Sequence, residues 1–128
     1  MYRFWYNTNM ASIKLEVKFF CTEQGAEPVR AWLSKLSKEE KLIIGTDLKM
    51  IQMCWPIGMP LVKPVSNGLW EARSSLPQRK ISRIFFVIQS NAIILLHGFI
   101  KKSQKTPHQE LELAKKRKRQ MERVYEKK

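Results

Sequence analysis

Basic side chains gather in the second half of the chain, where their spacing suits contact with a polyanion. Residues 69–105 contain seven Lys or Arg side chains, and Glu71 is the only acidic residue in this range. The seven are Arg73, Arg79, Lys80, Arg83, Lys101, Lys102 and Lys105. Clustered cations attract phosphate groups and release their counterions on binding. We therefore expect a nucleic-acid partner, with an acidic protein or a merely soluble basic surface as the alternatives.

Arg83 occupies an unusual position, because it lies within an apolar run. Alternation along a strand places Arg83 on the face of Phe85 and Val87. A buried, unpaired guanidinium there is costly. Arg83 is therefore expected either to be exposed in a concave site or to pair with Glu71, which shares a face with Arg73 on the preceding strand. A pair that only joins the strands is as plausible as a site.

His97 is the one side chain of this region suited to act as both acid and base at neutral pH. The alternation places His97 and Phe99 on one face with Ile93 and Leu95. A histidine on so apolar a strand is more often a packed core residue. The run KKRKR at residues 115–119 is usually a solvated helix face, and contact with nucleic acid is the alternative.

Length and composition exclude several classes of protein. The chain has 128 residues, of which 44% are hydrophobic, and a net charge of +13, so we expect one globular domain. Its longest apolar runs, residues 84–88 and 92–96, fall far short of the about 20 residues that a membrane span needs. No signal peptide opens the sequence, so a cytoplasmic location is expected. Cys21 and Cys54 form no metal-binding motif, and we expect no metal and no cofactor.

The hydrophobic pattern predicts an α+β domain with the order β-α-α-β-β-β-α. Alternating apolar residues from Ile13 to Phe19 predict a strand, and Pro28 opens a helix. Ser37 and Glu40 form a capping box at the start of a second helix, residues 38–53, which completes a helical hairpin. Residues 1–12 are expected to be an extension of the domain formed by residues 13–126.

Three strands and a helix are predicted after a Pro-rich loop at residues 56–68. The strands cover residues 69–75, 81–89 and 92–100, with a turn at Ser90-Asn91 between the last two. Thr106-Pro107 opens the last helix. The core side of that helix is expected to carry Leu111, Ala114, Met121 and Tyr125. We expect a small, mostly antiparallel sheet with one face on the helical hairpin and the other partly open.

Four segments carry a family resemblance. They are LVKPV at residues 61–65, LWEAR at 69–73, RIFFVI at 83–88 and LLHGFIKKSQKTP at 95–107. With the helical hairpin and the final helix, they resemble the HigB-like branch of the RelE/ParE toxin superfamily of type II toxin–antitoxin systems. The resemblance spans about residues 13–126, and the predicted order of elements matches the RelE-like fold.

The resemblance implies an mRNA interferase, a metal-independent endoribonuclease that cuts translated mRNA at the ribosome and so inhibits translation. The expected catalytic residues are Arg73, Arg83, His97, Lys101 and Lys102. The expected RNA-binding residues are Arg79, Lys80, Lys105, Lys115, Lys116 and Arg117. Family members that instead inhibit DNA gyrase, as ParE does, provide one alternative, and a non-catalytic nucleic-acid or ribosome-binding module provides another.

The resemblance also implies a partner protein. It would be a cognate HigA-like antitoxin with a helix-turn-helix domain, usually encoded next to the toxin. Operator DNA would be bound only through the complex with this antitoxin. No membrane partner is expected.

Overall fold

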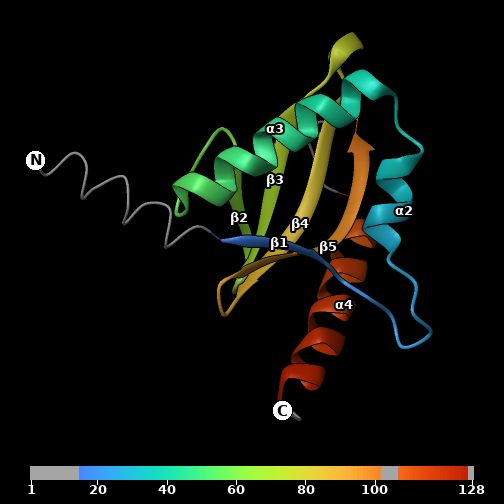
Figure 1. The fold of residues 1–128 in the computed structure, drawn as a ribbon, viewed down its shortest axis with the longest axis vertical. Helices are drawn as coiled ribbons and strands as arrows, with labels where there is room; N and C mark the ends of the chain where they lie inside the picture. The colour runs from blue at the N-terminus through green and yellow to red at the C-terminus, as the bar shows by residue number, and fades with distance from the viewer. Residues whose placement is uncertain (1–14, 102–106, 127–128) are drawn as a thin grey trace, which may run out of the picture.

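A five-stranded sheet forms the centre of the computed structural model, which describes residues 15–101 and 107–126 (Figure 1). The strand order is β1-β5-β4-β3-β2. The strands are β1 (Glu16–Phe19), β2 (Val62–Ser66), β3 (Leu69–Ser75), β4 (Ile81–Gln89) and β5 (Ala92–Lys101). The helices are α2 (Pro28–Ser34), α3 (Lys38–Cys54) and α4 (His108–Glu126). The α+β architecture predicted from the hydrophobic pattern is confirmed.

The first strand joins the far edge of the sheet. β1 pairs in parallel with β5, starting with Glu16 opposite Ala92, whereas all other pairs are antiparallel. The sheet is therefore mostly antiparallel, as expected. The predicted extension, Ile13 and Thr106 lie outside the described residues.

The Pro-rich segment contains a strand that the sequence pattern did not predict. β2 lies within residues 56–68 and pairs with β3, with Val62 opposite Ala72. The expectation of a loop throughout this segment is therefore wrong. Pro64 interrupts the apolar alternation, but a proline without an N–H is tolerated at the edge of a sheet, where β2 lies.

Both predicted helix starts in the hairpin are confirmed. Pro28 occupies the first turn of α2, where its missing N–H leaves no hydrogen bond unmade. Ser37 caps α3: its hydroxyl accepts from the N–H of Glu40, and the Glu40 carboxylate accepts from the N–H of Ser37. The capping box fixes where the chain turns from α2 into α3.

The two faces of the sheet carry separate hydrophobic cores. The core toward α2 and α3 includes Val29, Ile44, Ile51, Ile84, Phe86, Ile93 and Leu95. The core toward α4 includes Phe20, Phe85, Val87, Leu96, Phe99, Ala114 and Met121, with Leu111 packed against it. In Figure 1, α3 crosses in front of the strands and α4 extends below the sheet. The predicted core positions of α4 are confirmed except at Tyr125, whose side chain is outside the described part of the structure.

A bulge in β5 changes which way its side chains point. Phe85 pairs with His97 and Phe86 pairs with Leu95, which leaves Leu96 as an extra residue on β5. The alternation therefore breaks between Leu95 and His97. Our prediction that His97 and Phe99 share a face with Ile93 and Leu95 is wrong for this reason.

β5 also approaches α2 closely just after the bulge. A Cβ atom at Gly98 would lie 2.6 Å from the Trp32 ring, so only glycine fits beside this indole. The contact connects the β5 segment that precedes Lys101 to the helical hairpin. None of the helices within the described ranges is both long and apolar enough to cross a bilayer.

Candidate functional site

Three neighbouring strands bring basic side chains to the α4 face of the sheet. Arg73 of β3 lies opposite Arg83 of β4, and Arg83 lies opposite Phe99, two residues before Lys101 on β5. Because side chains two apart on a strand share a face, all three basic residues lie on one side. We call Arg73, Arg83 and Lys101 the cation cluster.

A buried carboxylate lies at the centre of the cation cluster. Glu71 has no exposed surface, and Arg83 Nη1 donates a hydrogen bond to its Oε1 at 2.8 Å. Arg73 Nε lies 3.9 Å from the same oxygen. Of the two alternatives expected for Arg83, the structure shows the pair with Glu71 rather than exposure in a concave site. The charge-assisted hydrogen bond holds the Arg83 guanidinium in position, whereas Arg73 lies near Glu71 without a hydrogen bond from its Nε to that carboxylate.

Lys101 is the most unusual member of the cation cluster. It is only 4% exposed, and its Nζ has no hydrogen-bond partner among the residues that the structure describes. Burial lowers the pKa of the Lys101 ammonium, and the positive charge of Arg83 lowers it further, while Glu71 opposes the change. The neutral amine, which can accept a proton, is thereby favoured relative to an exposed lysine.

The members of the cation cluster differ in their access to solvent. The Arg73 side chain is 21% exposed, whereas the Arg83 side chain is 1% exposed. Arg73 is therefore the member of the cation cluster most accessible to an anion from solvent, whereas Arg83 and Lys101 are buried. Lys63 of β2 lies opposite Glu71 and adds a further positive charge. Sequence reasoning missed Lys63, because its position is clear only once residues 62–66 are recognised as a strand.

The structure holds His97 apart from the cation cluster. Its Nε2 lies 2.8 Å from Glu110 Oε1, and its ring stacks with Phe85 and Phe99. Four residues along β5 separate it from Lys101, roughly 13 Å in an extended strand, and Phe99 lies between them. The contact with Glu110 instead links β5 to the first turn of α4.

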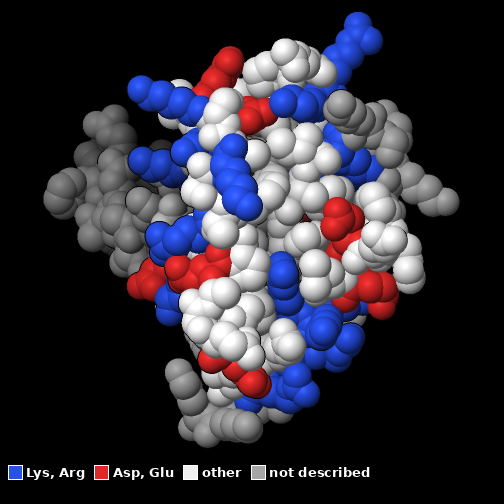
Figure 2. All heavy atoms as spheres, turned by 90° about the vertical axis from the view of Figure 1, so that its right-hand side faces the viewer, with Lys and Arg blue, Asp and Glu red and all other residues white. Residues whose placement is uncertain are grey.

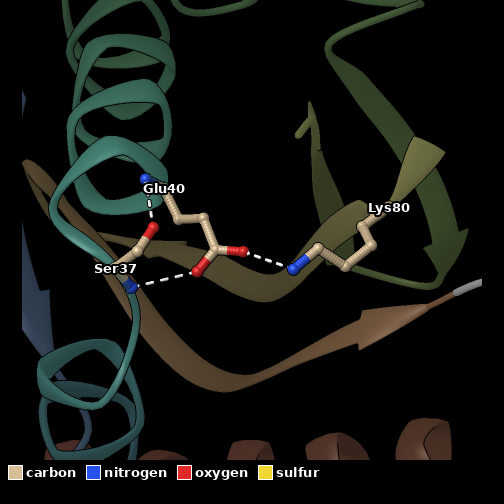
Figure 3. A network of polar contacts seen from close by, with 3 residues as sticks. All are labelled: Ser37, Glu40 and Lys80. Carbon is tan, nitrogen blue, oxygen red and sulfur yellow. Dashed lines mark hydrogen bonds and ion pairs between the residues drawn. The ribbon is translucent and has the colours of Figure 1, made fainter. Parts of the chain in front are cut away.

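Lys80 also has a partner away from the cation cluster (Figure 3). Its Nζ lies 2.7 Å from Glu40 Oε2, which joins the start of β4 to the capping box of α3. The hydrogen bond from Lys80 and the N–H of Ser37 lower the pKa of the Glu40 carboxyl to about 2. Arg79 is exposed in the short 3-10 turn Pro77–Arg79.

The basic side chains of the α4 run differ in whether they face solvent or contact other residues of the protein. Lys115 lies 3.5 Å from Glu112, and Lys116 is exposed. Arg117 instead donates to the carbonyl oxygen of Leu96 at 2.8 Å, so its guanidinium is used within the protein. Lys102 and Lys105 lie outside the described residues. The described residues contain no group of three or more His, Cys, Asp or Glu side chains placed to hold a metal.

Comparison with known proteins identifies a family for most of the chain. The family model described as "Phage derived protein Gp49-like (DUF891)" matches residues 31–119. This range contains the whole cation cluster and extends from within α2 into α4. No curated protein matches the chain.

Proposed function

Because the chain belongs to the Gp49-like family of phage-derived proteins, a family of RelE-like type II toxins, we propose that it is a HigB-like mRNA interferase. In this proposal the protein is a metal-independent endoribonuclease that cuts translated mRNA in the cytoplasm. The observation that carries the proposal is the cation cluster: three basic residues from three neighbouring strands on one face of the sheet, two of which contact one buried carboxylate. Even with Glu71 and a neutral Lys101, the two guanidinium groups leave such a site with a net positive charge, which suits a phosphate.

The reaction that fits this site uses the RNA itself as the nucleophile. The ribose 2′ oxygen loses its proton and attacks the adjacent phosphorus, and the bond from phosphorus to the 5′ oxygen breaks. The products are a 2′,3′-cyclic phosphate and a 5′-hydroxyl. Negative charge accumulates on the phosphate oxygens in the transition state, and fixed positive groups stabilise it more than they stabilise the substrate.

The environments of the three cations suggest different roles. Arg73, the most exposed, would contact the scissile phosphate. Arg83, held by Glu71, would add a fixed positive field behind it. Lys101 would accept the 2′ proton, because burial favours its neutral amine. Lys102, next in the chain, is our candidate for donating a proton to the leaving 5′ oxygen.

Family membership also motivates proposals about partners. We propose that a cognate HigA-like antitoxin with a helix-turn-helix domain neutralises this protein and that their complex binds operator DNA. We further propose that the ribosome presents the mRNA to the cation cluster. These proposals rest on the family alone.

The direct test is to induce the protein in bacteria and map the 5′ ends of a translated mRNA by primer extension. The variant of choice is Arg73→Ala, because Arg73 is the least buried member of the cation cluster and its loss leaves the contact between Glu71 and Arg83 in place. The matched control is Lys49→Ala, which removes an exposed cation from α3. Circular dichroism checks that each variant folds.

We expect wild type and Lys49→Ala to arrest growth and to produce new 5′ ends in phase with codons. Arg73→Ala should lower cleavage by about 10²–10³-fold, the usual effect of losing one donor to a transition-state oxyanion. Growth arrest with intact mRNA and a DNA-damage response would instead indicate a gyrase inhibitor. Salt-sensitive RNA binding without any cleavage product would indicate a binding module. Either result would overturn the proposal.

A further inference from the structure

A second surface, separate from the cation cluster, lies between α4 and the chain that leaves β1. It is an open groove of about 700 Å³, lined on one side by residues 18–24 and on the other by α4. Ile94 lies in its lining, seven residues before Lys101 on β5. That separation corresponds to roughly 23 Å along an extended strand. We call this surface the α4 groove.

The lining of the α4 groove combines an apolar floor with basic edges. Phe20, Ile94 and Met121 are buried members of the core beneath α4 and form part of the lining. Val124 also lines the groove and is 54% exposed, so apolar surface continues from the floor to the rim. A continuous apolar strip with a polar rim is typical of surfaces that bind another protein.

Cations occupy both edges of the α4 groove. Lys18 lies on the β1 side; its side chain is 53% exposed and its Nζ lies 3.8 Å from the exposed carboxylate of Glu16. Lys116 and Arg123 are exposed on the α4 side. Two helical turns separate them, which corresponds to about 10 Å along the helix. Figure 2 shows Lys and Arg side chains spread over the face that it draws, and one group of them lies in its lower part, the level at which α4 lies in Figure 1. Glu23 is the only acidic side chain in the lining.

The aromatic residues of the lining favour a protein over single-stranded RNA as the occupant. Bases bind such surfaces by stacking on exposed aromatic rings. Phe20 is 5% exposed, and the Arg117 guanidinium lies 5.9 Å from its ring centre. The Phe19 ring is covered by Arg30 at 4.6 Å. Neither ring offers a free stacking face.

We propose that the α4 groove binds an acidic, amphipathic helical segment of a partner protein. Aliphatic side chains of the segment would lie on the floor, and its carboxylates, spaced two turns apart, would meet Lys116 and Arg123. Lys18 would meet a carboxylate from the opposite edge. This binding mode follows the general pattern in which an amphipathic helix places its apolar face in a groove. It does not depend on the proposed RNA cleavage.

Binding of designed peptides tests the proposal. The probe is a fluorescently labelled helical peptide with Leu on one face and Glu at the flanking positions, and its affinity is measured by fluorescence anisotropy. One comparison peptide keeps the Leu face but carries Gln in place of Glu, and another has the same composition in a scrambled order. The test variant of the protein is Lys116→Glu/Arg123→Glu. The control is Lys115→Glu/Arg119→Glu, which changes the net charge of the same helix equally at residues outside the lining.

We expect the acidic amphipathic peptide to bind at least tenfold more tightly than either comparison peptide. The test variant should lose at least tenfold in affinity, the control less than twofold, and added salt should weaken binding to wild type. Equal binding of all three peptides, equal loss in both double variants, or no binding by the acidic peptide would overturn the proposal. So would an RNA oligonucleotide that binds wild type and loses affinity only in the test variant. The Arg73→Ala protein should still bind the peptide, which separates failure here from failure of the proposed cleavage.

Discussion

Replacing Lys101 by methionine should make the protein more stable while removing the RNA cleavage that we propose. The substitution keeps an unbranched side chain of similar length and removes a charge that is 4% exposed and has no hydrogen-bond partner among the described residues. It leaves Glu71 in contact with Arg83. Most substitutions at buried positions destabilise a protein, so a gain here is a specific consequence of the unfavourable surroundings of Lys101.

The direction of the effect follows from the lowered pKa of Lys101. Each pKa unit by which folding lowers it costs the folded state about 1.4 kcal/mol when the amine is charged. Replacing a whole buried ion pair by apolar residues of similar volume gives gains of about 1–4 kcal/mol where it stabilises at all, and this range bounds the gain for the single charge of Lys101. Because the attraction to Glu71 is also lost, we expect about 1–2 kcal/mol at neutral pH, or roughly 3–8 °C in Tm.

The sign of the pH dependence provides a second check. A lysine whose pKa is lowered by folding destabilises the folded state below that lowered pKa. The penalty decreases as the pH rises from there toward about 10.4, the pKa of an unperturbed lysine. The stability advantage of Lys101→Met over wild type should therefore shrink between pH 7 and pH 10.

Urea unfolding at pH 7 and at pH 10, combined with RNA cleavage assays at pH 7, measures all three effects. Lys49→Met, on the exposed face of α3, is the control and should change neither stability nor cleavage. A loss of more than about 1 kcal/mol in Lys101→Met, or an advantage that grows with pH, would refute the view that burial penalises this amine. Unchanged cleavage would refute its role in catalysis.

Three further substitutions test other parts of the structure. Glu71→Gln leaves the buried Arg83 without its charged partner and should lower the free energy of unfolding by about 3–5 kcal/mol, measured with urea; an unchanged value would show that the pair is dispensable. Gly98→Ala places a Cβ 2.6 Å from the Trp32 ring and should cost about 1–3 kcal/mol, with altered tryptophan fluorescence; an unaltered spectrum would argue against the close contact. The Glu40 carboxyl has a pKa lowered to about 2, so its stabilising contribution is present above pH 4.5 and lost as the pH falls toward 2. Wild type should therefore lose its stability advantage over Glu40→Gln across that range in acid titrations, and a constant difference would contradict this.

Local sequence signals were sufficient to predict most of the fold. Dense β-branched and aromatic residues predicted β4 with the bounds that the structure shows, and apolar residues predicted β5 to within one residue. The short strand β3 was also predicted with its observed bounds. Ser37 and Glu40 predicted the start of α3 because a capping box satisfies backbone donors locally. β2 could not be predicted in this way. Its pairing with β3 depends on a partner strand, and Pro64 removes the local signal.

The candidate site was only partly predictable. Alternation left two alternatives for Arg83, exposure in a concave site or a pair with Glu71, and the structure shows the pair, since both residues lie on regular stretches of neighbouring strands. The same rule failed for His97, because the extra residue Leu96 shifts the alternation within β5 and no local pattern marks the bulge. The burial of Lys101 depends on residues from several strands, so its position in the sequence alone does not reveal it.

The parallel pairing of β1 has a consequence for the newly made chain. Glu16 and its neighbours are synthesised early, yet their partners, from Ala92 onward, leave the ribosome only after most of the protein has been made. β1 therefore cannot join the sheet during most of translation, because both of the paired segments must first be made. Their pairing then carries the entropic cost of closing a long loop. β5 also supplies Lys101, so the cation cluster forms only when synthesis is nearly complete. Nascent chains released before β5 is made would be inactive for lack of this strand.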